Sequence, residues 1–572
     1  MPEQGDAKFS FNLIDDRWIP CIMPDGRQEE KSLREVLLQA GGIEEIFDSS
    51  PLVTIALHRL LLAVLHRNFG PGSGGEWQTM WRQGKGEWQR GKLSDYLDQW
   101  RHRFDLFSEK HPFYQCASLP FSATDSKGKF KSYEKPIANL IHELSSGDNA
   151  TLFDHTNESE PKAVSAAEAA RLLVAFQSFA VGGLITRLEG EGPSADNAPL
   201  VKGAVVLVKG KNLFQTLMLN LHRYNRDDEE PFYMEQDDAP AWEQNEETHA
   251  QDRTPKGYLD LLTWQSRRVK LHPEQDENGH IIVMRVVIMK GNQFPDGFSL
   301  HQKEPMLAFR KVRKPGKGQD PWPPIAFAED RALWRDSLAL FQSVEDERAR
   351  PKIMSWLNDL STNSIIPLST TYDLSIIGLV TSKAKIALWR HERLPLPLVY
   401  LDDKESEKLI AKLKKALEIA EDSGRLLGPG FVDVAIKGNN VRLPSPIHVL
   451  AQELLPKDQK GLVDPDAVKS FVNSLSPARP YWARLGMSFN RLVGELAKDK
   501  LIEGDYGATV LPWWAEEVRI AAWQAFEEVT NSFDHSGRLI KAVTKARNEF
   551  ERRLNTILKP YKEIERKGGE EA

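Results

Sequence analysis

The stretch SEKLIAKLKKALEIAEDSG, residues 406–424, marks a change in the character of the chain. Its apolar residues recur every three or four positions, so a helix would collect them on one face. These residues are Leu409, Leu413, Ala416, Leu417 and Ala420. Since such a stripe is stable only against another apolar surface, the stretch predicts an amphipathic helix that packs on further helices.

The sequence after this stretch supplies those helices. Residues 479–499 keep the helical period, and residues 511–529 carry apolar side chains at four-residue spacing behind Pro512, which predicts a helix start there. The last segment has one apolar stripe, made of Leu539, Val543, Ala546, Phe550, Leu554 and Ile557. Four such helices can bury each other's stripes as a bundle, so we predict a helical bundle domain over residues 403–572.

The first 402 residues have a mixed pattern. Pro24–Gly26 has turn chemistry, and Ser32 with Glu35 forms a capping box, which together predict a strand, a turn, a strand and a helix. Residues 201–210, 280–291 and 369–380 are rich in β-branched side chains and predict strands. The expected fold class is therefore α+β, with a large mixed domain over residues 1–402 followed by a C-terminal four-helix bundle.

Composition indicates the cellular compartment that we expect for the protein. The chain has 572 residues and only two cysteines, Cys21 and Cys116, so no disulfide framework is possible and a reducing cytoplasm is expected. The first residues lack the features of a signal peptide. No uncharged apolar run reaches the roughly 18–20 residues of a membrane span, so we expect a cytoplasmic protein with no membrane partner.

Charge is segregated along the chain although the net charge is only −7. Residues 227–247 are acidic, a feature that would fit a disordered segment or one that repels random DNA. Basic residues gather in the last helix and in an irregular loop that contains Arg310, Lys311, Arg313, Lys314 and Lys317. Such clusters suit sequence-independent attraction of phosphates, and the plainer alternative is that they are solvated loops and helix faces.

No motif of a known catalytic centre is present. The sequence lacks a phosphate-binding loop, a zinc-protease motif, a serine-hydrolase elbow and a calcium loop. Asp154–His155 and Asp534–His535 juxtapose two catalytic residue types, but such pairs are more often capped turns. We therefore expect a protein that is not an enzyme and that holds no metal or cofactor.

Several short motifs in a fixed order nevertheless resemble one known family. They are FNLIDDRWIP (11–20), HPFYQ (111–115), LFDHT (152–156), FAVGG (179–183) and WRHERLPLP (389–397), followed by the helical bundle. This series resembles the CasA-type large subunit of type I-E Cascade, the RNA-guided antiviral surveillance complex of bacteria.

The resemblance implies a function that base pairing alone cannot supply. In such complexes the guide RNA pairs with the target, and protein recognises a short protospacer-adjacent motif (PAM) in the duplex. The large subunit would recognise this motif in double-stranded DNA, start strand separation and recruit a helicase–nuclease. Its partners would also include the crRNA-containing complex, with its backbone and small subunits.

The resemblance also implies roles for particular residues. A hairpin tip formed by Ser382, Lys383 and Ala384 would act as a wedge between base pairs, although the family has glutamine at the place of Lys383, and an exposed turn is the alternative. Gly182 and Gly183 match a glycine loop that approaches DNA, or else form a plain helix C-cap.

Two further matches concern a lysine and a loop. Lys290 matches a lysine that enters the minor groove, where acceptor atoms suit an ammonium group, or else is an ordinary strand-end lysine. The loop with Phe153, Asp154 and His155 matches one near the guide RNA's 5′ end and the neighbouring subunit, unless Phe153 packs into its own domain.

Two other functions remain open on sequence alone. A non-catalytic protein-interaction scaffold without nucleic-acid contact would also use many aromatic residues. A hydrolase whose catalytic residues assemble only in space would leave no linear motif, and Asp154, His155, Asp534 and His535 would then be its candidates.

Overall fold

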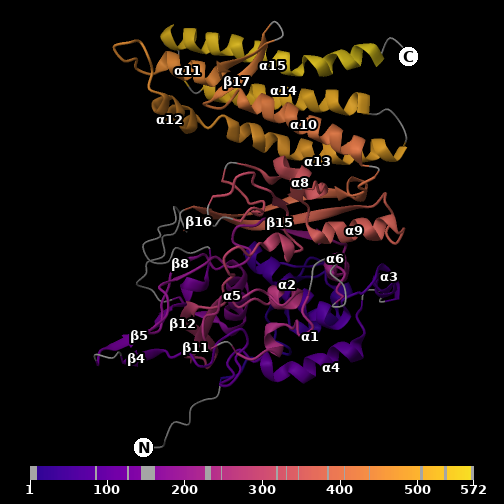
Figure 1. Ribbon diagram of the computed structural model, residues 1–572, viewed down its shortest axis with the longest axis vertical. Helices are drawn as coiled ribbons and strands as arrows, with labels where there is room; N and C mark the ends of the chain where they lie inside the picture. The colour runs from indigo at the N-terminus through magenta and orange to yellow at the C-terminus, as the bar shows by residue number, and fades with distance from the viewer. Residues whose placement is uncertain are drawn as a thin grey trace, which may run out of the picture. The chain divides into compact units, whose positions relative to one another are not determined.

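The computed structural model divides into two compact units. The N-terminal unit contains Met1–Glu329, Ala339–Leu368 and Tyr372–Leu394, and the C-terminal unit contains Asp330–Leu338, Ser369–Thr371 and Pro395–Ala572. The structure describes residues 9–83, 87–124, 128–142, 162–225, 234–246, 248–316, 320–329, 331–345, 347–382, 385–404, 406–436, 439–502, 507–531, 533 and 537–568. Strands and helices mix in the first unit and long helices dominate the second, which confirms the predicted α+β class (Figure 1).

The first described elements follow the predicted order. β1 (Ile19–Ile22) pairs with β2 (Gln28–Lys31) and with β3 (Glu45–Ile46), and α1 (Leu33–Leu38) begins at Ser32. The Ser32 hydroxyl accepts the Glu35 backbone N–H, and the Glu35 carboxylate accepts the Ser32 N–H. The capping box is confirmed, because both of these bonds satisfy donors that the first helical turn leaves open.

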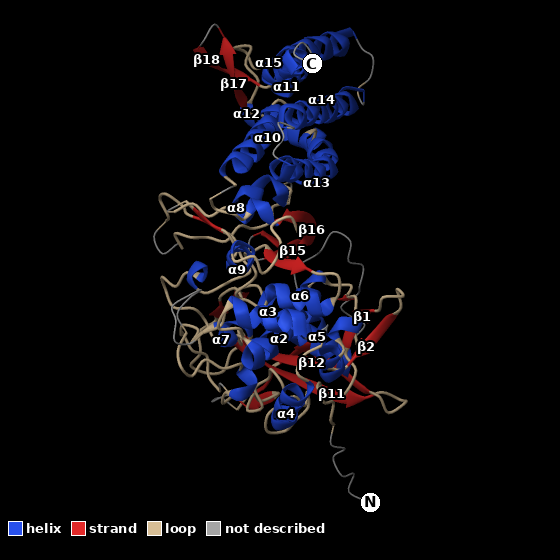
Figure 2. Cartoon of the chain, turned by 90° about the vertical axis from the view of Figure 1, so that its right-hand side faces the viewer, coloured by secondary structure: helices blue, strands red, loops and turns tan. Residues whose placement is uncertain are grey.

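Helix α2 (Pro51–Phe69) forms the core of the N-terminal unit. It is the one helix of the described residues that is long and apolar enough to cross a membrane, yet 78% of that window is buried inside the fold. It lies beside α5 (Ala166–Phe179), as both views show (Figures 1 and 2). Arg59 of α2 is buried and its guanidinium donates two bonds of 2.9 Å to the carboxylate of Glu304.

The sheet that contains Lys290 is built on two long strands. β11 (Arg267–Gln275) and β12 (Ile281–Lys290) form an antiparallel pair, with Arg267 opposite Lys290. The other edge of β12 pairs with β7 (Val164–Ser165) at residues 282–283 and with β6 (Glu134–Pro136) at residues 285–287. That edge therefore receives several short segments in turn.

A second sheet carries the long hairpin. β10 (Val205–Lys209) pairs with β15 (Thr371–Ser382), which pairs with β16 (Lys385–Pro397). The strands predicted at 201–210, 280–291 and 369–380 are thus present. The remaining elements of this part are α3 (Gly74–Gln83), α4 (Arg90–Trp100), β4 (Ser122–Thr124), β5 (Phe130–Ser132), β8 (Gly183–Leu184), β9 (Ser194–Ala195), α6 (Leu213–Asn220), α7 (Tyr258–Leu262), β13 (Phe309–Arg310), α8 (Ser337–Phe341), β14 (Arg348–Ala349) and α9 (Lys352–Thr362).

The C-terminal unit is built on four long helices, α10 (Glu407–Arg425), α13 (Ala478–Ile502), α14 (Gly507–Asn531) and α15 (Gly537–Gly568). All five apolar residues predicted for the first of them are buried. Trp514 of α14 is fully buried, and its indole N–H donates 2.8 Å to the carbonyl of Ala416 in α10. The shorter α11 (Pro446–Leu454) and α12 (Pro465–Leu475) complete the helices.

Two features of this unit differ from the sequence prediction. The hairpin of β17 (Phe431–Ile436) and β18 (Asn439–Pro444) was not predicted. The prediction that Pro512 marks a helix start is wrong, because α14 begins at Gly507 and Pro512 lies inside it. Proline removes one backbone donor there, and the burial of the following Trp514 and Val518 offsets that loss.

Candidate nucleic-acid interface

A small hairpin follows α5 and contains both glycines of the FAVGG motif. We call residues 182–195 the glycine hairpin; its strands β8 and β9 pair Gly183 with Ala195 and Leu184 with Ser194. The helix itself ends earlier, with Ala180 as its C-cap at φ −59°. The alternative that these glycines form the helix C-cap is therefore wrong.

The two glycines have different physical reasons to be glycine. A Cβ on Gly182 would come within 2.9 Å of the backbone N of Asn197 and the carbonyl carbon of Asp196, so the hairpin closes only without a side chain there. Gly183 has a φ of +153°, is exposed, and faces open space where a Cβ would be. Gly183 is therefore the glycine whose backbone a ligand can approach closely.

Lys290 lies next to the glycine hairpin. Thr186 of the hairpin forms a parallel bridge with Met289, on the edge of β12 that β11 does not occupy. The Lys290 side chain is 25% exposed, and its Nζ lies 3.6 Å from a carboxylate oxygen of Asp252, which is itself largely exposed. The structure thus sets the glycine hairpin, which contains Gly182 and Gly183, against the end of β12 next to Lys290.

Arg267 fixes the base of the glycine hairpin. Its guanidinium is buried and donates to the carbonyls of Ala180, Val181 and Asp196, at 3.4, 3.1 and 2.7 Å. Burial lowers the pKa of Arg267 to about 10, because the charge has left water for carbonyl dipoles. These bonds join the end of α5 to the far side of the hairpin.

Arg268 links the end of β12, at Lys290, to the glycine hairpin. Its side chain donates 2.7 Å bonds to the carbonyls of Lys290 and Thr248 and an ion pair to Glu191 of the glycine hairpin. Successive residues of a strand point to opposite faces, so this dipeptide reaches both the hairpin base and the end of β12. The sequence prediction missed both arginines; two adjacent arginines at the start of an apolar strand were the available signal.

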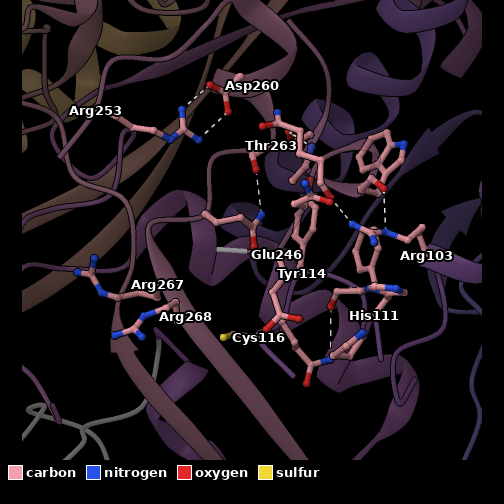
Figure 3. Close-up of a pocket in the computed structure, with 18 residues that line it drawn as sticks. Arg103, His111, Tyr114, Cys116, Glu246, Arg253, Asp260, Thr263, Arg267 and Arg268 are labelled. Carbon is pink, nitrogen blue, oxygen red and sulfur yellow. Dashed lines mark hydrogen bonds and ion pairs between the residues drawn. The ribbon is translucent and has the colours of Figure 1, made fainter. Parts of the chain in front are cut away.

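The same arginines line a cavity of about 80 Å³ together with the HPFYQ motif (Figure 3). Arg253 donates two bonds to the carboxylate of Asp260, and Arg103 donates to the carbonyls of Trp242 and Gln244. Tyr114 holds a φ of +55°, which is unusual for a bulky residue. These guanidiniums bind acceptors of the chain itself, so they stabilise the loops that line the cavity.

The two strands of the long hairpin lie on either side of the predicted tip. β15 ends at Ser382 and β16 begins at Lys385. Lys383 and Ala384 lie outside the described residues, as does the side chain of Ser382. Within β16, the Arg390 guanidinium donates a 2.7 Å hydrogen bond to the carbonyl of Ala328.

The basic loop lies near the middle of strand β16 of this hairpin. The backbone N–H of Arg310 donates to Pro323, and Ile325 donates to Ala308, so the loop borders the segment that Arg390 contacts. Arg310, Arg313 and Lys314 are exposed, whereas Lys311 is half-buried with its Nζ 5.7 Å from the centre of the Trp322 ring. Lys317 lies outside the described residues.

Several sequence predictions concern residues outside the described parts. Phe153, Asp154, His155, Asp534 and His535 all fall there. Within the described ranges, no group of three or more His, Cys, Asp or Glu side chains is placed to hold a metal ion.

In the described part of the acidic segment, residues 234–246, two carboxylates bind inside the fold. Asp238 is buried and accepts backbone N–H groups of Leu259 and Asp260, and burial raises its pKa. Glu243 accepts from Arg67 and from the Tyr96 hydroxyl. Asp238 and Glu243 therefore stabilise local structure, whereas Glu235 and Asp237 of the same segment are exposed.

Comparison with known proteins gives one consistent family. The family model described as CRISPR-associated protein Cse1 matches residues 12–525. The chain is 31% identical over 557 residues to the CRISPR-associated protein CasA/Cse1 of Thermus thermophilus, covering 96% of this chain and 98% of that protein. The resemblance found in the short sequence motifs is thereby confirmed.

Solved structures agree with this result. The structure of Thermus thermophilus CasA (Cse1) is 28% identical and superposes with a TM-score of 0.71, over 95% of this chain and 99% of that one. Cse1 of Thermobifida fusca, at 24% identity, shares the fold with a TM-score of 0.76 over 96% of this chain and 98% of that one.

Proposed function

The chain belongs to the Cse1 family of CRISPR-associated proteins, and from this premise we propose that it is the large subunit of a type I-E Cascade-like antiviral complex. In this role it recognises the PAM in double-stranded target DNA and starts strand separation. The observation that carries the proposal is the bridge between Thr186 of the glycine hairpin and Met289. It puts the hairpin, with its exposed Gly183 of positive φ, next to the end of β12 where Lys290 lies.

The chemistry of this pair suits the minor groove. A groove edge offers acceptor atoms at most base pairs, and Lys290 supplies a donor that can leave the exposed Asp252 at small cost. Gly183 lets the backbone come close without a side chain between. Arg267 and Arg268 hold the two elements in register, so that they meet the duplex as one rigid surface.

Strand separation is the role we assign to the β15–β16 hairpin. Unstacking one base step costs a few kcal/mol, which a rigid projecting element can supply from binding energy. Ser382, Lys383 and Ala384 would form the wedge. Pairing with β10 along β15 supports the hairpin's rigidity at its base.

The remaining contacts complete the assignment. Arg310, Lys311, Arg313, Lys314 and Lys317 attract phosphates without sequence preference. The loop with Phe153, Asp154 and His155 faces the guide-RNA end and the neighbouring subunit of the crRNA-containing complex. The chain itself is not an enzyme in this proposal; it recruits a helicase–nuclease and works in the cytoplasm.

The test is target binding by a reconstituted guide-RNA complex, with and without this chain, against duplexes randomised beside the target. The chain should create a preference among the flanking sequences. Lys290→Ala should reduce that preference about tenfold, the scale of one lost base contact of 1–3 kcal/mol. Arg285→Ala, on the same strand β12 but bound to Glu274 and Glu134, is the matched control.

Equal preference with and without the chain would remove the proposal. A non-catalytic scaffold would then be the better description. A preference that survives Lys290→Ala unchanged would reject Lys290 as a contact while leaving the role of the whole chain intact.

A further inference from the structure

We infer that the β4–β5 hairpin is a second DNA-contacting element, which binds the duplex just beyond the flanking motif without regard to sequence. This inference rests on the proposed function, since it extends the surface formed by the glycine hairpin and Lys290. Three independent features support it: where the hairpin leaves the sheet, what it exposes, and how its base is held.

The pairing along β12 places this hairpin beside the glycine hairpin. The free edge of β12 receives β6 at residues 285–287, with Glu134 opposite Val287, and next receives Thr186 at Met289. The chain leaves β5 at Ser132 and enters β6 at Glu134, so the β4–β5 hairpin joins the sheet next to that point. The two hairpins therefore originate from neighbouring positions on one strand edge.

A shared apolar cluster confirms that neighbourhood. Tyr133 is buried against Val287 and Met289, and two partly buried residues pack on the same cluster: Ala123 of β4 and Leu188 of the glycine hairpin. Two-stranded hairpins are marginal when isolated, so this anchoring is what allows β4–β5 to keep a defined direction. The hairpin extends from the sheet at the edge where β4 and β5 are labelled (Figure 1).

The outer part of the hairpin exposes an aromatic ring among lysines. Phe130 is 70% exposed, and Lys129, Lys131 and Lys135 are exposed along the same segment. At about 3.4 Å per residue, Phe130 lies about 10 Å along the strand from the anchored Tyr133. An exposed phenylalanine at this distance from the core contributes little to folding.

Charge complementarity selects the partner. Glu134 is the only acid among residues 128–135, and its carboxylate accepts from His272 and Arg285, so the outward charge of this segment is positive. Phosphates on a duplex that lies along the glycine hairpin would meet these lysines. Phe130 would pack against sugar and base edges in the groove, as apolar side chains of minor-groove proteins do.

The experiment measures how the affinity of the assembled complex depends on the length of duplex beyond the flanking motif, at one fixed flank sequence. For the native chain, affinity should rise as the duplex is extended over the hairpin and then level off. A chain with Lys129→Gln, Lys131→Gln and Lys135→Gln should lose that rise, and its salt slope should fall by about 2–3, or about 0.9 per phosphate contact. Phe130→Ala should lower the affinity of the complex for the longer duplexes about fivefold.

Matched variants control for charge and for apolar surface. Lys408→Gln, Lys414→Gln and Lys469→Gln remove the same charge from exposed positions of the C-terminal unit, and Phe431→Ala removes a comparably exposed ring there. These variants should keep the length dependence. Because all substitutions are at exposed positions, the thermal unfolding of each variant should match that of the native chain.

Two results would overturn the inference. One is an unchanged length dependence in the triple-lysine variant. The other is reduced incorporation of the Phe130→Ala chain into the complex with normal length dependence in the complexes that form, which would make the hairpin a protein contact. Both leave flank preference in the native complex intact, whereas a failure of the proposed function would abolish that preference itself.

Discussion

Arg267 and Lys290 lie opposite each other in the β11–β12 ladder, and they serve one surface from the two sides of that pair. Lys290 ends its strand with a partly exposed ammonium group, whereas Arg267 turns inward and binds the carbonyls on either side of the glycine hairpin. Lys290 can contact a ligand directly, whereas Arg267 can only position the residues that do. This difference separates contact from positioning and leads to the first prediction.

Arg267→Gln should weaken flank preference without removing any DNA contact. The shorter, neutral side chain leaves the partly buried carbonyls of Val181 and Asp196 without this donor, and each lost hydrogen bond costs about 0.5–1.5 kcal/mol. We expect the unfolding free energy to fall by about 2–3 kcal/mol and amide exchange in residues 182–195 to accelerate more than elsewhere. Hydrogen exchange on the purified chain measures this, and target binding measures the preference.

A control for the arginine variant is available in the same sheet. Arg285→Gln removes a half-exposed guanidinium that pairs with Glu274 and Glu134, so it should cost less than about 1 kcal/mol and leave the hairpin protected. If amide exchange in the glycine hairpin accelerated equally in both variants, Arg267 would not be what stabilises this hairpin.

The two glycines should respond differently to alanine. Gly182→Ala places a Cβ against backbone atoms of residues 195–197, so the hairpin must shift, and we expect a loss of about 1–3 kcal/mol in unfolding free energy. Gly183→Ala meets open space and is limited by its φ of +153°, so its main effect should be on target binding. Thermal unfolding and binding by the assembled complex separate the two effects.

Gly192 is the matched control in the same hairpin. A Cβ there meets nothing within 4 Å, and its backbone lies outside the positive-φ region. Gly192→Ala should therefore be neutral in both measurements. If Gly182→Ala were as well tolerated as Gly192→Ala, the crowding inferred for the hairpin base would be refuted.

Local sequence signals predicted the elements that depend on local physics. The stripe from Leu409 to Ala420 is buried because a 3.6-residue period allows only one face to meet the bundle. The capping box at Ser32 also follows from residues close in sequence. Each of these signals is complete within a few residues, which is why it could be recognised.

The candidate site needed information that a linear pattern does not hold. Gly182 is crowded by residues 195–197, and Arg267 bonds to carbonyls more than seventy residues earlier in the chain. No residue near Lys290 in the sequence indicates that Thr186 pairs with the neighbouring Met289. The individual residues could be named from motifs, but their meeting at one strand end is a property of the tertiary fold.

The buried ion pair between Arg59 and Glu304 should be costly to break and cheap to replace. Glu304→Gln leaves a buried guanidinium without its carboxylate, so we expect a loss of about 3–5 kcal/mol in unfolding free energy. The double variant Arg59→Met with Glu304→Leu removes both charges and should cost clearly less. Denaturant unfolding of the three proteins measures this, and a double variant at least as unstable as the single one would contradict it.

Acid should destabilise the N-terminal unit through His58. This side chain is fully buried, its Nδ1 lies 2.7 Å from the carbonyl of Thr54, and burial together with nearby Lys209 lowers its pKa to about 4. Between the unfolded pKa of about 6.5 and this value, the unfolded chain binds more protons, so stability falls as the pH falls. From pH 7 to pH 5, protonation of His58 in the unfolded chain lowers the unfolding free energy by about 2 kcal/mol.

The variant His58→Gln removes the titrating group. The difference between the unfolding free energies at pH 7 and pH 5 should therefore shrink by about this amount, whatever the variant costs at pH 7. His280→Gln changes an exposed histidine and should leave the difference as it is in the native chain. If His58→Gln leaves the difference unchanged, the buried histidine does not account for acid sensitivity.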